Sequence, residues 1–166
     1  MNHALHLFLL ITSFSIQGFA QQKGDSTIRQ SEIIGIWQLN SSVVSSALKS
    51  NFQFYKTGKF VYNIDEYNDL NPIRSISGKF KMEGSTLYLK IEEIRKLAEY
   101  KVVESSPAFQ FGPFVLDGGK IITVKQSDST YSEHEIKIVK NQKTKCVTID
   151  FDKYFKLSSD PDKSNK

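Results

Sequence analysis

The sequence is poor in the residues that cross-link a chain or bind metals. Cys146 is the only cysteine, which excludes an internal disulfide, so packing alone has to hold the fold. Its neighbour Val147 and the strand-like run around it predict a buried small hydrophobe at this position rather than a reactive thiol. After residue 20 the chain has one histidine, His134, whereas a metal site needs several converging ligands. We therefore expect neither a metal site nor a cofactor.

Long apolar runs are missing beyond the first twenty residues, which excludes a later membrane-spanning helix. Residues 5–16 are mostly apolar and are followed by small residues up to Ala20, an arrangement typical of a signal peptide cleaved after Ala20. The predicted location is therefore secreted or periplasmic. An uncleaved anchor is the alternative, because neither Lys nor Arg precedes the apolar run.

Strong charge is also missing. The formal net charge is +4 with a pI near 9.0, and the positive residues are spread along the chain. Solubility accounts for this surplus at least as well as a polyanionic partner does. Gly118-Gly119 precedes a strand pattern and not a helix, so it indicates a hairpin turn rather than a phosphate-binding loop. We therefore do not expect a nucleic-acid partner.

The chain does contain many short segments in which apolar and polar side chains alternate. Residues 76–82 and 86–91 flank Glu83-Gly84-Ser85 and predict a hairpin with one buried face. Residues 92–103 mix helical spacing with strand-forming residues, and we expect a short helical turn leading into a strand there. The other predicted strands are residues 33–39, 52–55, 59–64, 120–125, 131–139, 145–151 and 154–157.

These segments predict an all-β protein, because no helical crossover recurs between them. A single open sheet of so many strands would expose a long edge, so we expect one antiparallel up-and-down β-barrel of about eight to ten strands. The predicted domain spans residues 32–158. Residues 21–31 form a flexible lead-in, and residues 159–166 form a disordered tail.

The start of the predicted barrel carries a familiar arrangement of glycines and aromatics. Gly35-Ile36-Trp37 opens the domain, Phe52-Gln53-Phe54 and Gly58-Lys59-Phe60 form the next hairpin, and Gly84 leads into Leu87-Tyr88-Leu89. Over residues 33–89 the chain resembles the small secreted bacterial lipocalin-like domains, which are calycin-type barrels. The resemblance implies that Trp37 is a packing residue that closes one end of the barrel, and that Gly35 allows close backbone approach.

The resemblance also implies a possible small hydrophobic ligand. The segment around Gly112-Pro113 is the best candidate for a barrel mouth or lid, because three phenylalanines surround this break. An eight-stranded barrel is wide enough for one small ligand or for its own side chains, so a filled core that acts as an interaction module stays open. Such a module would use outer loops or the lysine-rich hairpin that carries Lys137, Lys140, Lys143 and Lys145, on a protein partner that the sequence does not identify. The candidate ligand-binding residues are Phe54, Tyr62, Phe80, Phe109, Phe111 and Phe114.

Catalysis is the least favoured class of function. His134 lies between Glu133 and Glu135, and strand alternation would place it on one face, toward solvent, and the two glutamates on the other. Ser-His-acid chemistry also needs a nucleophile on a strained turn, and G-x-S-x-G does not occur. We do not expect an enzyme; a hydrolase or isomerase using His134 is the remaining alternative.

Overall fold

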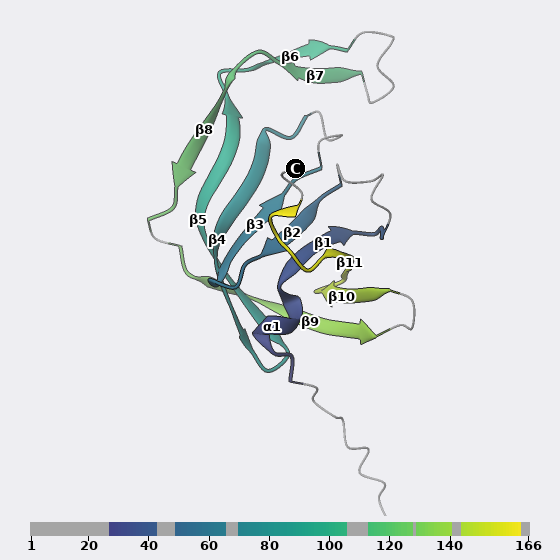
Figure 1. Cartoon of the computed structure of the whole chain (residues 1–166). Coiled ribbons are helices and arrows are strands. Elements are labelled where there is room, and N and C mark those ends of the chain that lie inside the picture. The colour runs from purple at the N-terminus through teal and green to yellow at the C-terminus, as the bar shows by residue number, and fades with distance from the viewer. Residues whose placement is uncertain are drawn as a thin grey trace, which may run out of the picture.

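The structure is a computed structural model of the 166-residue chain. It describes residues 27–42, 49–65, 70–105, 113–127, 129–140 and 144–163. The predicted signal segment, residues 1–20, lies outside the described residues. The described part forms one strand-rich body with a single short helix (Figure 1).

Eight antiparallel strands close into a barrel. Each strand pairs with the next in the cyclic order β1-β2-β3-β4-β5-β9-β10-β11, and β11 pairs back with β1. This arrangement confirms the prediction of an antiparallel barrel. The bounds are β1 (Gly35–Leu39), β2 (Asn51–Phe54), β3 (Lys59–Asn63), β4 (Ile73–Glu83), β5 (Thr86–Ala98), β9 (Tyr131–Lys140), β10 (Lys145–Ile149) and β11 (Asp152–Ser158).

An extra strand, β8 (Lys120–Lys125), arises because β5 changes partner along its length. Residues 86–90 of β5 pair with β9, whereas residues 93–98 pair with β8 on the same edge. β4 pairs with the other edge of β5 along both parts. β8 and β9 therefore occupy successive stretches of the same edge of β5, and residues 126–130 connect them. β9 turns toward β10 and closes the barrel, and β8 extends the sheet above it (Figure 1).

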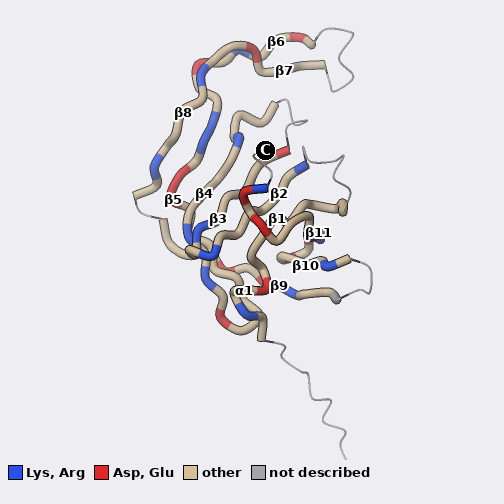
Figure 2. The backbone as a smooth tube through the Cα atoms, in the orientation of Figure 1, with Lys and Arg blue, Asp and Glu red and all other residues tan. Residues whose placement is uncertain are grey.

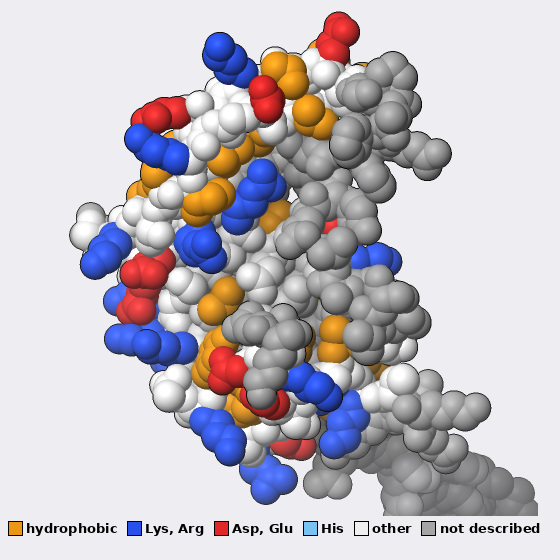
Figure 3. Space-filling model, turned by 45° about the horizontal axis from the view of Figure 1, so that its top comes forward, with side chains coloured by type: hydrophobic (Ala, Val, Ile, Leu, Met, Phe, Trp, Pro, Cys, Tyr) orange, Lys and Arg blue, Asp and Glu red, His pale blue; other side chains and the backbone are white. Residues whose placement is uncertain are grey.

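A small second sheet lies beyond this extension. It consists of β6 (Lys101–Glu104) and β7 (Phe114–Asp117), which pair only with each other among the described residues. Two large apolar side chains on it are exposed, Val102 at 58% and Phe114 at 44%. Figure 3 shows hydrophobic side chains among charged ones at this end of the molecule, and Figure 2 shows that the two signs of charge are interspersed along the chain.

The two ends of the barrel are called here the base and the mouth. The base carries the turns at Gly58 and Gly84 and the helix α1 (Gln30–Ile33), which Figure 1 shows against the bottom of the barrel. The amide of Ile28 donates a hydrogen bond to the carbonyl of Gly84. The indole Nε1 of Trp37 donates to the carbonyl of Ile33 at 2.6 Å, which ties α1 to the first strand.

The barrel interior is filled near the base by one continuous apolar cluster. Each of the eight barrel strands contributes residues of its inner face, as period-two alternation requires, and Ile28, Ile33 and Ile34 add to the cluster from the segment before β1. Trp37 is 1% exposed, and Cys146, on the outer face of β10, is equally buried, as its apolar neighbours predicted. The buried cluster consists of Ile28, Ile33, Ile34, Trp37, Phe52, Phe54, Phe60, Phe80, Leu87, Leu89, Ile136, Val147, Ile149 and Tyr154.

Three local predictions differ from the structure. The helical turn expected within residues 92–103 is wrong: β5 continues to Ala98, because β4 and β8 pair with it on both sides. The flexible lead-in was predicted to reach Ser31, yet Ile28 is buried and α1 already starts at Gln30. The tail that was predicted to be disordered contains a backbone hydrogen bond from the amide of Lys163 to the carbonyl of Asp160.

Candidate functional site

The inner face of the sheet continues out of the core toward the mouth. Register places Trp37 opposite Phe52, and Phe52 opposite Tyr62. The same row then crosses three more strands. Because directly opposed residues of antiparallel strands share a face, the whole row lies on the inner face. Its outer members are half-buried, and we call them the mouth row: Tyr62, Ile76, Ile94 and Val124.

The floor beneath the mouth row is aromatic. Phe52 is its centre, with ring centroids 5.2 Å from Phe54, 4.4 Å from Tyr62 and 5.2 Å from Tyr154. Burial raises the pKa of Tyr154 far above its ordinary value, and the neighbouring Tyr62 raises it further through its charge and a hydrogen bond. Tyr154 therefore stays a neutral phenol that presents a polar group within an apolar floor.

The structure divides the predicted ligand-binding residues. Phe54 and Phe80 are buried in the core with their ring centroids 4.9 Å apart, so they form the floor and not an open wall. Tyr62 is half-buried and belongs to the mouth row. Phe114 lies on the separate β6–β7 sheet, outside the barrel. The other two, Phe109 and Phe111, lie outside the described residues.

A chain of hydrogen bonds connects β9 to the turn between β10 and β11. Ser132 Oγ lies 2.9 Å from His134 Nε2, and His134 Nδ1 lies 2.8 Å from Asp150 Oδ2. Asp150 Oδ1 also accepts a hydrogen bond from the amide of Glu135, and the amide of Asp150 donates to the carbonyl of Glu135 at 2.7 Å. We call Ser132, His134 and Asp150 the clasp.

The prediction of a solvent-facing His134 is wrong. The side chain of His134 is only 27% exposed, because His134 pairs with the buried Leu87 and therefore takes the inner face of β9. The predicted alternation of faces along this strand is confirmed, because Glu133 and Glu135 are exposed on the face opposite to His134.

The order of the clasp is that of a Ser-His-Asp triad, but its hydrogen bonding suits a structural role. The hydroxyl of Ser132 donates to the carbonyl of Leu89 at 3.1 Å, and a hydroxyl has one proton to give. In that state the Ser132 proton is directed to Leu89 and not to His134 Nε2, where a catalytic base would accept it. The two ring nitrogens thus contact Ser132 and Asp150, and the side chain joins β9 to the turn at Asp150.

Removing the clasp should loosen this turn. We expect His134→Ala to lower the free energy of unfolding by about 1–2 kcal/mol, because Asp150 loses a hydrogen-bonded partner. Hydrogen exchange of the Asp150 amide should become faster than in the native chain. The control is Glu133→Ala, on the exposed outer face of the same strand. Equal exchange rates in both variants would show that the clasp does not hold the turn.

Comparisons with protein-family models, with curated proteins and with solved structures found no match to this chain. Within the described part of the chain, the one helix is too short and too polar to cross a membrane. The same residues do not bring three or more His, Cys, Asp or Glu side chains together as metal ligands.

Sequence reasoning missed the clasp and most of the mouth row. The spacing Ser-x-His in a predicted strand already places Ser132 and His134 on one face. Asp150 gives no such signal, because it reaches His134 from the turn of the next hairpin. Ile94 was missed because the segment around it was expected to begin as a helical turn, and its neighbour Val124 only acquires a role through pairing with it.

Proposed function

We propose that the protein is an exported lipocalin-like barrel that binds a small apolar or amphipathic molecule at its mouth without catalysis. One observation carries this proposal: the inner-face row passes from buried Trp37 and Phe52 to the half-buried mouth row without a polar interruption. A partly exposed apolar surface that adjoins the core is stabilised when a ligand covers it, because apolar area is then removed from water. The phenols of Tyr62 and Tyr154 supply polar groups for an amphipathic molecule.

The proposal includes export of the protein and a relationship to lipocalin-like proteins. The apolar residues 5–16 and the small residues before Ala20 support export, and Gly35-Ile36-Trp37 at the start of a closed eight-stranded barrel supports the relationship. N-terminal sequencing of the protein secreted by an expressing bacterium tests the cleavage site. A mature chain that starts at Gln21 is the expected result.

The binding proposal is tested by titration with the neutral apolar dye N-phenyl-1-naphthylamine. We expect saturable fluorescence enhancement, and we expect Val124→Glu to weaken it about tenfold or more, because a carboxylate replaces a contact worth about 1.5–3 kcal/mol. β8 lies outside the closed barrel, so this change should leave the barrel folded.

The matched control is Thr123→Glu, which places the same charge one residue away on the exposed outer face. Dye binding should be unchanged in this variant. Equal loss in both variants, or an absence of saturable binding in the native chain, would refute a ligand site at the mouth row. Native mass spectrometry of the purified protein then identifies any co-purified molecule.

A filled-core interaction module is the second candidate. It is favoured by the packed aromatic floor and by the exposed Val102 and Phe114 on the β6–β7 sheet, which stands apart from the barrel. Two-stranded sheets are marginally stable alone, so a partner that covers this one would stabilise it. The dye titration separates the two functions, because a module of this kind has no saturable apolar site at the mouth.

A further inference from the structure

A hollow lies at the base of the barrel, beside the apolar cluster. It has a volume of about 530 Å³ and is bounded by α1, by the turn between β2 and β3, and by the end of β11. We call it the basal cavity. Two lysines, three uncharged polar residues and one isoleucine line it, and none of these residues is acidic: Gln30, Ser31, Ile34, Lys56, Lys156 and Ser159.

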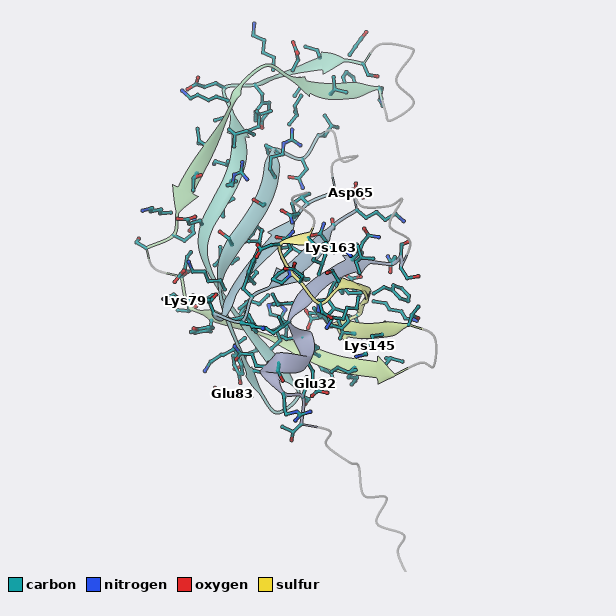
Figure 4. All side chains as sticks on the ribbon, in the orientation of Figure 1. Glu32, Asp65, Lys79, Glu83, Lys145 and Lys163 are labelled. Atoms are coloured by element: carbon teal, nitrogen blue, oxygen red, sulfur yellow. The ribbon has the colours of Figure 1, made fainter. Side chains whose placement is uncertain are left out.

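Lys156 is held in place by its position on β11. It lies directly opposite Trp37 in the β1–β11 pairing, and its Nζ is 5.1 Å from the centroid of the indole ring. Burial lowers the pKa of Lys156, and the nearby positive charge of Lys145 lowers it further. Figure 4 labels Lys145 at the start of β10, the strand next to β11. The ammonium group of Lys156 is therefore partly removed from water and lies near a second positive charge.

Four lysines in the described residues have carboxylate partners, whereas Lys156, like the remaining described lysines, forms no ion pair there. Four such pairs have N–O distances between 2.6 and 3.3 Å. They are Lys79–Glu92, Lys81–Glu83, Lys120–Glu99 and Lys137–Glu135. A half-buried cation without a carboxylate is costly, and an anion that enters from solvent would relieve this cost.

Acidic residues adjoin the cavity residues in sequence but do not line the cavity. Glu32 on α1, labelled in Figure 4, accepts a hydrogen bond from the amide of Arg29 and pairs with its side chain. Asp160 and Asp162 follow the cavity residue Ser159, and their charges help to raise the pKa of Tyr55. They reduce the positive potential on that side but do not line the cavity.

We propose that the basal cavity binds a small organic anion, a carboxylate or a phosphate monoester that carries an apolar group. The two lysines supply positive charge, and the amide and hydroxyl groups of Gln30, Ser31 and Ser159 supply further hydrogen bonds. Ile34, the apolar residue of the cavity lining, would contact the apolar group of the ligand. The volume is in the range of small-molecule sites. This site is independent of the mouth row, which lies at the other end of the barrel.

The test is isothermal titration calorimetry with phenyl phosphate on the full chain at constant ionic strength. We expect saturable one-site binding, weakened about tenfold or more by Lys156→Met, because a charge-assisted hydrogen bond is lost. The matched control is Lys153→Met: its Nζ also lies 5.1 Å from an aromatic centroid, that of Phe155, but outside the cavity. This control should bind like the native protein.

Lys56→Met provides a second variant in case Lys156→Met does not fold. Lys56 is exposed on the turn between β2 and β3, so its replacement should leave the barrel intact and still weaken binding several-fold. Weaker binding of inorganic phosphate than of phenyl phosphate would support a contribution from the apolar group. Equal affinity in Lys56→Met, Lys153→Met and the native chain, or no saturation with either anion, would overturn the proposal.

Discussion

Replacing Trp37 by Ala is expected to lower the free energy of unfolding by about 3–5 kcal/mol, the range found for large buried aromatics. The side chain is 1% exposed and packs at the base of the barrel. Its loss leaves a void that rigid neighbouring strands cannot close, and the carbonyl of Ile33 loses its 2.6 Å hydrogen bond. The measurement is urea denaturation followed by circular dichroism, because Trp37 is the only tryptophan and fluorescence is lost with it.

Trp37→Phe is the control that separates packing from hydrogen bonding. It keeps an aromatic ring in the core but removes the indole Nε1 donor, so we expect a smaller loss of about 1–2 kcal/mol. Hydrogen exchange in α1 should rise in both variants, because this bond ties the helix to β1. A loss below about 1 kcal/mol for Trp37→Ala would show that Trp37 does not hold the base of the barrel.

Gly35→Ala is expected to cost about 2–5 kcal/mol, the second largest effect. The φ of Gly35 is +125°, a conformation that side chains other than glycine rarely adopt. An added Cβ would also overlap the carbonyl oxygen of Ser158 and come within 3.1 Å of the Cα of Ser159. The backbone would have to move where β1 meets β11, the seam that closes the barrel. Thermal and urea unfolding measure the change.

Gly84→Ala is the matched control for this prediction. Gly84 also has a positive φ, +60°, but nothing lies within 4 Å of an added Cβ. It should cost only the backbone term, about 1 kcal/mol. If the two variants were equally destabilised, the close approach of β11 to Gly35 would not be what requires glycine there.

Much of the fold could be predicted because the alternation of apolar and polar residues identifies a strand from its own sequence. Alternation placed β8 at residues 120–125, as observed, and predicted the hairpin around Gly84. The same reasoning failed for residues 92–98, where the spacing of Ile94 and Leu97 is helical. Their strand conformation is imposed by β4 and β8, and neither neighbour can be inferred from the segment itself.

The candidate sites were less predictable than the fold. Tyr62 was predicted for the ligand site, but its neighbours in the mouth row come from strands far apart in the sequence. His134 was predicted to face solvent, and its contact with Asp150, sixteen residues away, could not be inferred from the strand alone. Lys156 gave no signal at all, since its place over Trp37 depends on the pairing of the first barrel strand with the last.

The sequence by itself determined where most strands run, where glycine turns interrupt them, and which side chains share a face. Those properties follow from the period of two and from local turn chemistry. Only the tertiary structure decided that the sheet closes through the pairing of β1 with β11 and that β5 pairs first with β9 and then with β8. It also decided that Lys156, which forms no ion pair among the described residues, lies over the ring of Trp37. These features depend on register between distant segments, which is a property of long-range pairing and not of any one stretch of chain.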